Sequence, residues 1–386
     1  MTLRIGIVGC GNISDIYLIN APRFPAIGVV ACADMKPEAA ARQAERYGVA
    51  AMSVGELLAR DDIDIVLNLT IPAAHAEVSL AALESGKHVY TEKPLAATLQ
   101  DGIAIVEAAK ARGLRVGAAP DTVLGASVRA ARQMIDEGAI GRPVLGTAAV
   151  LSHGMEHWHP DPTFFFKPGG GPVFDMGPYY LSALVNLLGP VARVQATGMK
   201  AFEKRLVTTP HSQIRGQEIA VEVLTSVQAL LSFESGAEIS FFASWDVWRH
   251  GLRPIEIHGT EGSMRVPDPN WFGGSVEIAR GQEDWDVTPT SGRTFGKANW
   301  PRGDQRFANY RGLGLAEMAT AIGAGRPHRA NGDVALHVLA VIAGIIEAAE
   351  SRRCVTIEQG CERPEPLSEA EAAGLVEGGG APADAR

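Results

Sequence analysis

Short apolar runs alternate with amphipathic stretches over the first 120 residues, and this alternation constrains the fold more than any other feature. Three stretches have helical spacing and each closes near a glycine, at residues 36–47, 74–85 and 98–112. The apolar runs between them cover residues 3–8, 28–33, 63–69, 88–91 and 114–118. Strands that alternate with helices are typical of βαβ units, so we predict a parallel sheet covered by helices.

The pattern changes after Pro120. Helical spacing returns at residues 126–137, 315–324 and 334–351, and β-rich runs separated by turn residues occupy 218–233, 237–245 and 255–259. A chain of 386 residues also exceeds the roughly 250–300 residues that one hydrophobic core supports. We therefore predict an α/β protein with an N-terminal domain over 1–122 and a second α/β domain over 123–361, built on a mostly antiparallel sheet. Residues 362–386 are rich in Glu, Ala, Gly and Pro, which predicts a mobile tail.

Composition excludes several classes of protein. The net charge is −9 and no run of Lys or Arg stands out, which argues against nucleic acid as a partner. The N-terminal apolar run is too short for a signal peptide or a membrane span, so we expect a cytoplasmic protein without a membrane partner. The four cysteines lack CxxC spacing, which argues against structural zinc and a disulfide scaffold.

The first strand runs into a glycine-rich turn typical of dinucleotide sites. Gly9 and Gly11 permit a tight turn and let backbone N–H groups approach a pyrophosphate at the start of a helix. Ser14 stands where a third glycine is usual. We predict that the turn binds a dinucleotide through Gly9, Gly11, Asn12 and Ile13.

Asp34 ends the second strand, 20 residues after Ser14. Its carboxylate can accept both ribose hydroxyls of an adenosine and would repel a 2′-phosphate, which favours NAD over NADP. Lys36 could soften that repulsion, so NADP stays open. The structural alternative makes Asp34 the N-cap of the helix that begins near Pro37.

Three further segments carry a family resemblance: Asn-Leu-Thr-Ile-Pro-Ala-Ala-His at 68–75, Glu-Lys-Pro at 92–94, and Gly-Gly-Gly-Pro-Val-Phe-Asp-Met-Gly-Pro-Tyr at 169–179. With them the chain resembles the Gfo/Idh/MocA oxidoreductases over about residues 3–360. The resemblance implies a Rossmann domain followed by an α/β domain whose open sheet forms homodimer or homotetramer contacts. It also implies oxidation or reduction of a secondary alcohol of a sugar or cyclitol with NAD(P).

The resemblance assigns roles to single residues. Lys93 is the usual proton-transfer residue, and Asp175 faces the substrate together with the residue four positions later. That residue is Tyr179 here, where most relatives have His. The resemblance further implies cofactor contacts from Thr70, Pro72, His75, Glu92 and Lys93, although a lone His in the first turn of a helix is often structural.

Elementary chemistry supports the same residues. Hydride transfer from an alcohol requires a group that removes the hydroxyl proton, and Lys93 stands at the carboxyl end of a predicted parallel strand, where open sheets bind ligands. Burial would lower its pKa and a nearby Asp175 would raise it, and the sequence leaves this balance open. Asp175 and Tyr179 are four residues apart, so on a helix they share one face, and Pro178 requires that helix to start only just before it. Asp175 as an N-cap and Tyr179 as a core aromatic are the structural alternatives.

Other substrate candidates follow from position and chemistry. Asp121 and Thr122 lie in the loop after the fifth expected strand. His157, Trp158 and Lys167 could line a sugar pocket, because aromatic faces stack on sugar C–H groups and Lys167 could reach an acidic substituent. The histidines at 153–159 resemble a metal cluster, but we expect no metal, since hydride transfer needs none.

The sequence thus predicts an NAD-dependent dehydrogenase that oxidises a ring secondary alcohol of a sugar, glycoside or inositol, with Lys93 as general base. Alternatives are a sugar–sugar oxidoreductase that retains NADP, an enzyme that uses transient oxidation to eliminate an aglycone, and a non-catalytic nucleotide-binding sensor.

Overall fold

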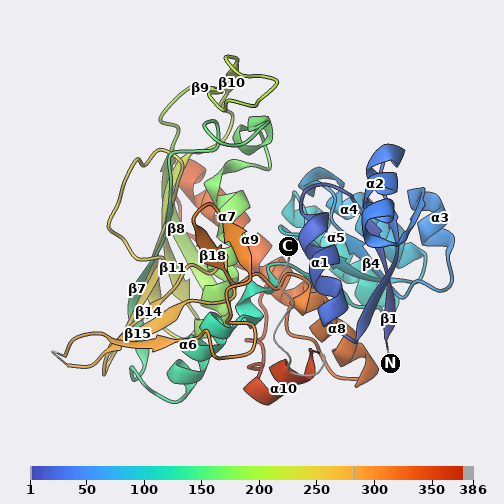
Figure 1. Ribbon diagram of the computed structural model, residues 1–386. Helices are drawn as coiled ribbons and strands as arrows, with labels where there is room; N and C mark the ends of the chain where they lie inside the picture. The colour runs from blue at the N-terminus through green and yellow to red at the C-terminus, as the bar shows by residue number, and fades with distance from the viewer. Residues whose placement is uncertain (1, 282, 377–386) are drawn as a thin grey trace.

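A computed structural model of the chain describes residues 2–281 and 283–376, which form two lobes joined by extensive packing (Figure 1). The N-terminal lobe contains a six-stranded parallel sheet in the order β3-β2-β1-β4-β5-β6. Its strands are β1 (Leu3–Val8), β2 (Ile27–Ala33), β3 (Ala50–Met52), β4 (Ile65–Asn68), β5 (His88–Thr91) and β6 (Val116–Ala118). This is the Rossmann arrangement that the alternation predicts, with β3 as the one strand that the sequence analysis did not expect.

Helices cover both faces of this sheet: α1 (Ser14–Asn20), α2 (Pro37–Tyr47), α3 (Val54–Ala59), α4 (His75–Glu84) and α5 (Leu99–Ala111). The strands are correspondingly apolar on both sides, and every residue of β4 is buried. The carboxyl ends of β1, β2, β4 and β5 therefore meet at one edge, where the loops that follow them can share a ligand.

The C-terminal lobe contains a nine-stranded sheet in the order β16-β15-β14-β13-β7-β12-β11-β8-β19. Only the β7–β12 pair is parallel, so the prediction of a mostly antiparallel sheet is confirmed. The strands are β7 (Pro143–Leu151), β8 (Val191–Met199), β11 (Ser226–Phe233), β12 (Glu238–Ser244), β13 (Ile255–Gly259), β14 (Ser263–Val266), β15 (Ser275–Ala279), β16 (Asp286–Pro289) and β19 (Val355–Thr356).

Two small hairpins lie outside the large sheet. The first pairs β9 (Lys204–Leu206) with β10 (Glu218–Ala220) at the top of Figure 1, and the second pairs β17 (Trp300–Arg302) with β18 (Gln305–Phe307). The expected single run at 218–233 is therefore two strands in different sheets. The strand breaks between them because the next backbone N–H groups bind elsewhere: Glu222 N donates to Phe166 O and Thr225 N donates to Met199 O. Neither bond continues the pairing of β10 with β9.

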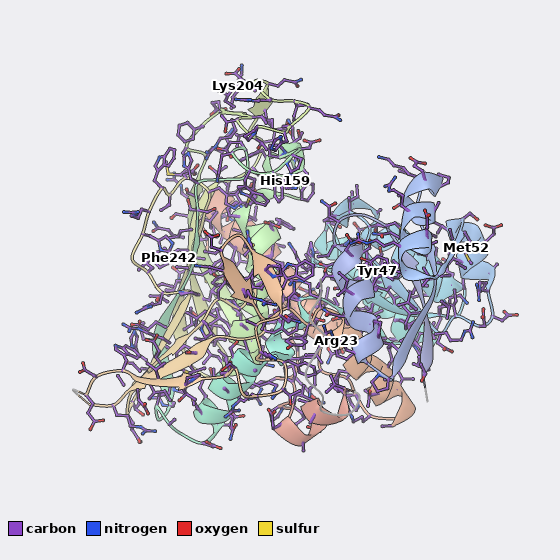
Figure 2. The ribbon with its side chains drawn as sticks, viewed as in Figure 1. Arg23, Tyr47, Met52, His159, Lys204 and Phe242 are labelled. Carbon is purple, nitrogen blue, oxygen red and sulfur yellow. The ribbon has the colours of Figure 1, made fainter. Side chains whose placement is uncertain are left out.

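Helices α7 (Gly171–Leu188) and α9 (Gly332–Ser351) cover the face of the large sheet that is turned toward the N-terminal lobe (Figure 1). In β11, buried Val227, Ala229 and Leu231 alternate with outward side chains, as expected for a sheet covered on one face. Phe242 lies on the opposite side of the sheet (Figure 2).

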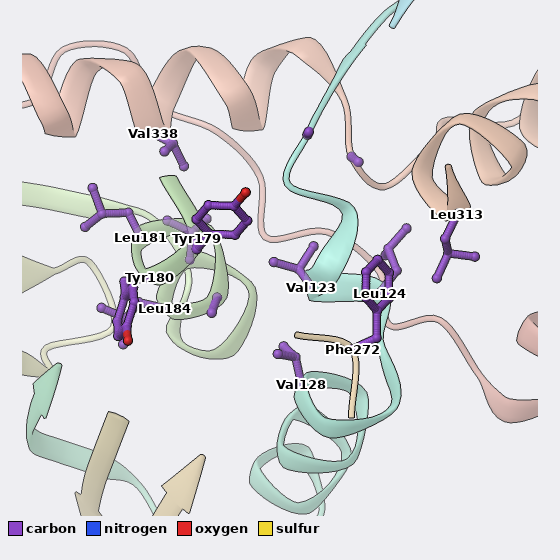
Figure 3. Close-up of a cluster of buried hydrophobic side chains, with 14 of the residues drawn as sticks. Val123, Leu124, Val128, Tyr179, Tyr180, Leu181, Leu184, Phe272, Leu313 and Val338 are labelled. Atoms are coloured by element: carbon purple, nitrogen blue, oxygen red, sulfur yellow. The ribbon is translucent and has the colours of Figure 1, made fainter. Parts of the chain in front are cut away.

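Helices α7 and α9 of the C-terminal lobe share one core. Tyr179 and Leu181 of α7 lie near Val338 of α9 and Val123, which precedes α6 (Ala126–Asp136), as Figure 3 shows. Helix α9 is long and apolar enough to cross a membrane, but it packs against α5, α7 and β8, as a core helix does. Helix α8 (Leu313–Gly323) packs against β2 and β6.

The described part of the C-terminal segment is packed, which corrects the expectation of a mobile tail over 362–386. Helix α10 (Glu369–Gly374) begins with a capping box at Ser368 and Glu371, and Leu367 is buried beside it. Arg329 donates to Glu371 at 2.8 Å. The overall composition of residues 362–386 gives no sign of these few apolar and charged contacts. They are nevertheless enough to attach this short segment to the rest of the lobe. Residues 377–386 lie outside the described part of the chain.

Candidate active site

The glycine-rich turn has the geometry that a dinucleotide requires. Gly9 has a φ of +102°, and a Cβ atom at this position would lie 2.6 Å from the carbonyl carbon of Leu69, so only glycine fits. A Cβ on Gly11 would meet no atom within 4 Å, which leaves the outer side of the turn open for a ligand. Ser14 Oγ donates to Gly11 O at 2.6 Å, so the residue in place of the third glycine closes the turn from within.

Asp34 is tied to this turn. Its Oδ2 accepts a hydrogen bond from Cys10 N at 2.7 Å, and its Oδ1 accepts one from Lys36 N at 2.8 Å. Helix α2 has Lys36 as its N-cap residue with no side-chain capping bond, which contradicts the capping alternative for Asp34. The turn and Asp34 together fit NAD: the turn would hold the pyrophosphate, and the carboxylate would hold the adenosine ribose.

The loops after β4 and β5 form the next part of the same sheet edge. Thr70 Oγ1 donates to Asn68 Oδ1 at 2.6 Å, and Pro72 is partly exposed beside it. Glu92 is buried: its Oε1 accepts from Tyr17 Oη at 2.9 Å and its Oε2 from Lys93 N at 2.9 Å.

His75 lies behind these loops, which corrects the expected direct contact with the cofactor. The side chain is fully buried, its Nδ1 lies 2.7 Å from Pro94 O, and its Nε2 lies 3.0 Å from Thr70 O. Burial lowers the pKa of His75 although both carbonyls oppose that effect. Its structural role is to join the loop after β4 to the loop after β5.

Lys93 and Asp175 form an ion pair between the two lobes. Lys93 Nζ donates to Asp175 Oδ1 at 2.7 Å and to Asp175 O at 2.7 Å, and each side chain is 16% exposed. Burial disfavours the ammonium, but the charges of Asp175 and of nearby Tyr179 and Glu92 outweigh it, so the pKa of Lys93 lies above its usual range. The charges around Lys93 thus favour the ammonium form in the balance that the sequence left open.

Helix α7 starts earlier than predicted. It begins at Gly171, so Pro178 lies inside it and the expectation of a start just before Pro178 is wrong. Pro178 cannot donate to the Phe174 carbonyl, and the next carbonyl, that of Asp175, accepts from Lys93. The N-cap is Gly170, which contradicts the capping alternative for Asp175.

Tyr179 belongs both to the core and to the polar site. Its ring packs among apolar side chains (Figure 3), and Lys93 Nζ lies 5.2 Å from the ring centre. Its hydroxyl accepts a hydrogen bond from Arg311 Nη2 at 3.3 Å. Tyr180 points instead to the sheet, where its ring centre lies 6.4 Å from that of Phe241.

Arg311 is a residue that sequence reasoning missed. It is buried, and its guanidinium also donates to Asn309 Oδ1 and Asn270 Oδ1, both at 2.9 Å. Burial opposes the charge of Arg311, but Tyr179, Glu92 and Asp121 raise its pKa above the usual range. Neither spacing nor a motif marks this arginine, because its partners are distant in sequence.

Asp121 and Thr122 are not exposed to a substrate, which corrects both expectations. Asp121 is 1% exposed, and its Oδ2 accepts from Gly312 N at 2.8 Å and Gly314 N at 3.0 Å, at the start of α8. Burial raises the pKa of Asp121 to about 6 against these two hydrogen bonds. Thr122 is fully buried. The end of strand β6 lies where the sequence predicts it, but the turn that follows directs the side chains of Asp121 and Thr122 into the protein.

A cleft of about 1460 Å³ extends from this site along the C-terminal lobe. Asn12 and Asp175 line one end of it, and His157 and Trp158 line the other. His159 and Lys204, which also line the cleft, lie at the upper end of the lobe in Figure 2. Lys167 is not among the described residues that line the cleft, because its ammonium pairs with Glu222 outside it.

Within residues 2–281 and 283–376, no group of three or more His, Cys, Asp or Glu side chains has the arrangement of a metal site. His153 instead stacks on Trp248.

Two family models match the chain. The model "Oxidoreductase family, NAD-binding Rossmann fold" covers residues 3–119, and the model "GFO/IDH/MocA C-terminal domain" covers residues 128–265. The first model covers the parallel sheet with its glycine-rich turn, and the second covers much of the lobe that carries Asp175.

Comparisons with individual known proteins give the same result as the family models. An inositol 2-dehydrogenase of Burkholderia cenocepacia is 35% identical over 298 residues, which cover 74% of this chain and 81% of that protein. A 1,5-anhydro-D-fructose reductase of Ensifer adhaerens is 30% identical over 266 residues, 68% of this chain and 74% of that protein. A levoglucosan dehydrogenase solved with NADH and levoglucosan shares the fold, with a TM-score of 0.79 and 22% identity over 93% of this chain and all of that one. The chain therefore belongs to the Gfo/Idh/MocA family of NAD-binding oxidoreductases.

Proposed function

We propose that this oxidoreductase is an NAD-dependent dehydrogenase that oxidises a ring secondary alcohol of a sugar, glycoside or inositol. The observation that carries the proposal is the contact between Lys93 and Asp175, 2.7 Å from Nζ to Oδ1, at the edge of the sheet that also carries the glycine-rich turn and Asp34. An amine that can exchange a proton thus lies where an alcohol must lose one.

NAD⁺, when bound, supplies the acceptor for the hydride. As the C–H bond of the alcohol carbon breaks and its electron pair leaves with the hydride, the hydroxyl proton passes to neutral Lys93 Nζ and a C=O bond forms. Asp175 then holds the resulting ammonium. The same geometry works in the reverse direction, where the Lys93 ammonium donates its proton to a carbonyl oxygen.

Tyr179 orients the reacting oxygen in this proposal. Because its oxygen accepts from Arg311, its single O–H remains free to donate toward the substrate. Lys93 and Tyr179 would then bind the same substrate oxygen from two sides, one as proton acceptor and one as donor.

The substrate class follows from the relatives. Proteins similar to this chain are named inositol 2-dehydrogenase and 1,5-anhydro-D-fructose reductase, and one of similar fold was solved with levoglucosan. Each of these compounds is a ring that carries secondary hydroxyl groups. In this chain, His157 and Trp158 line the cleft where such a ring would extend.

We also propose that the enzyme works in the cytoplasm as a homodimer or homotetramer. Within the described residues the outer face of the large sheet carries exposed apolar side chains, including Leu145, Met199 and Leu230. A second copy of the chain would cover them.

The test is a screen for reduced nicotinamide by absorbance, with sugars, acidic sugars, glycosides and inositols as substrates and with NAD⁺ and NADP⁺ in parallel. We expect NADH formation with one subset of rings and a strong preference for NAD⁺. Tight NAD binding without turnover of any compound would contradict the proposal and favour a sensor. Mass spectrometry of the purified protein distinguishes a further alternative, a sugar–sugar oxidoreductase, because such an enzyme would retain NADP through purification.

A further inference from the structure

Two loops at the far end of the cleft expose large aromatic side chains. Trp158 is 49% exposed and Trp248 is 82% exposed, and both line the same cleft as Asn12 and Asp175. Exposed tryptophans inside a cleft are costly for an isolated protein and usually mark a surface that binds something. The proposed function places Trp158 beside the cleft into which the substrate extends, but it gives Trp248 no role.

Contacts within the protein hold these aromatic side chains. The rings of His153 and Trp248 are stacked, with centres 3.3 Å apart and planes 18° apart. Trp158 meets the ring of His159 edge-on, with centres 5.4 Å apart. Val247 N donates to Ser152 O at 3.0 Å, which joins the two loops directly. We call His153, Trp158 and Trp248 the aromatic platform.

A buried ionic network fixes the platform from below. Arg205 Nη1 donates to Glu156 Oε1 at 2.8 Å, Nη2 donates to Trp245 O at 3.1 Å, and the guanidinium also pairs with Asp246. The three charged side chains are 5–9% exposed. Glu156 belongs to the loop of Trp158, and Asp246 belongs to the loop of Trp248. The ions therefore hold both loops in place while the indole rings stay on the surface.

The size of the cleft indicates how far a substrate extends. Its volume of about 1460 Å³ exceeds the roughly 300–1,000 Å³ of ordinary small-molecule sites. The cleft therefore has room for more than one sugar ring beside the nicotinamide end of NAD. The flat faces at the far end suit a second ring with a C–H-rich or aromatic face.

We infer that the aromatic platform is a subsite for the second ring of a glycoside, whose first ring reacts at Lys93 and Asp175. This inference rests on the proposed function and narrows its substrate to a disaccharide or an aryl glycoside, which share a ring with an apolar face joined to the reacting sugar. The cleft is continuous from Asp175 to the platform, which favours substrate over a second protein chain as the occupant.

The first test compares kcat/KM for matched pairs: each active monosaccharide against its disaccharide and its p-nitrophenyl glycoside. We expect the two-ring member to be at least about tenfold better, and Trp248→Ala to remove about five- to tenfold of that advantage. A larger gain for the disaccharide or for the aryl glycoside identifies which second ring is used. Equal kcat/KM for one and two rings in the unmodified enzyme would overturn the inference while leaving the proposed function intact.

Trp285→Ala is the matched control, because Trp285 stacks under Arg265 away from the cleft. It should alter one-ring and two-ring substrates alike. The alternative occupant of the platform is a second copy of the chain, and light scattering of the Trp248→Ala variant tests for it. A change in oligomer mass would show that the platform is a contact between copies of the chain and would reject the subsite.

A binding measurement makes the subsite testable without turnover. A disaccharide or p-nitrophenyl glycoside should quench the tryptophan fluorescence of the NAD-bound enzyme in a saturable way, and Trp248→Phe should reduce the amplitude. If no compound yields NADH, the proposed function fails, and this titration alone decides the subsite. Absence of saturable quenching at millimolar concentrations would then reject it.

Discussion

Lys93 of the nucleotide-binding lobe and Asp175 of helix α7 meet across the boundary between the lobes, with Nζ 2.7 Å from both Oδ1 and the backbone carbonyl of Asp175. One residue comes from the loop after β5 and the other from a helix that covers the second sheet. The pair therefore exists only when both lobes are folded and packed together. It also raises the pKa of Lys93 above its usual range, so Lys93 must lose its proton before it can accept one from an alcohol, and oxidation should be faster at alkaline pH.

Asp175→Asn should move the pH dependence of oxidation. The amide keeps an oxygen near Nζ but removes the negative charge that opposes the effect of burial, so the pKa of Lys93 should fall. The alkaline rise of kcat/KM should then begin at lower pH, while kcat falls by about 10- to 100-fold because Lys93 is less well held. The measurement is a pair of pH–rate profiles with Asp175→Glu as the charged control. Superimposable profiles for the wild type and the Asn variant would contradict the pairing.

Tyr179→Phe should lower kcat by about tenfold or more, because it removes the one O–H that can donate to the reacting oxygen. The ring and its packing remain, so the melting temperature should change little. Tyr180→Phe provides the control, since Tyr180 lies next to it on α7 but faces the sheet. Equal rates for the two variants would show that the Tyr179 hydroxyl plays no part.

Asp34→Ser should weaken the preference for NAD. The carboxylate would bind the ribose hydroxyls and repel a 2′-phosphate, so the ratio of kcat/KM for NAD⁺ to that for NADP⁺ should fall at least about tenfold. Glu38→Gln, also an acid-to-polar change near the start of α2, is the control. An unchanged ratio would mean that other groups select the cofactor.

Asp121 should make folding stability depend on pH in a defined window. Its pKa is about 6 in the folded protein, above the ordinary 3.8, so the folded state binds the proton more tightly than the unfolded state. The contribution of this group therefore falls as pH rises from about 4 to about 6, by roughly 3 kcal/mol in the free energy of unfolding.

Asp121→Asn removes this titration. Denaturant unfolding of both proteins at several pH values from 4 to 7 should give a difference that changes across the window and is constant above it. A pH-independent difference would show that Asp121 is ionised throughout.

Local periodicity was enough to predict most of the fold. The apolar runs of the first 120 residues became β1, β2, β4, β5 and β6, and the mostly antiparallel second sheet was also anticipated. The short strand β3 was missed because three residues, two of them exposed alanines, carry no periodicity. The C-terminal segment was misjudged because its composition is dominated by residues that do not make its contacts, which come from Leu367, Ala372 and Leu375.

The site could be predicted only where a motif marks it. Gly9, Asp34, Lys93 and Asp175 stand in short patterns, and the structure places them along one sheet edge and its facing helix. Arg311 and the platform residue Trp248 were missed, because their neighbours come from distant parts of the chain. Asp121, Thr122 and His75 were expected at the surface, but strand-end position does not determine whether a side chain turns inward.

The central claim is that Lys93 transfers the proton of the reacting alcohol, and Lys93→Met tests it most directly. The measurement is the rate of NADH formation with the best substrate, together with the Kd for NAD⁺ of the same preparation. We predict a loss of turnover of at least about 10²- to 10⁴-fold and a Kd for NAD⁺ within about twofold of the wild type. A Lys93→Met enzyme that binds NAD⁺ normally and turns over at the wild-type rate would contradict the account.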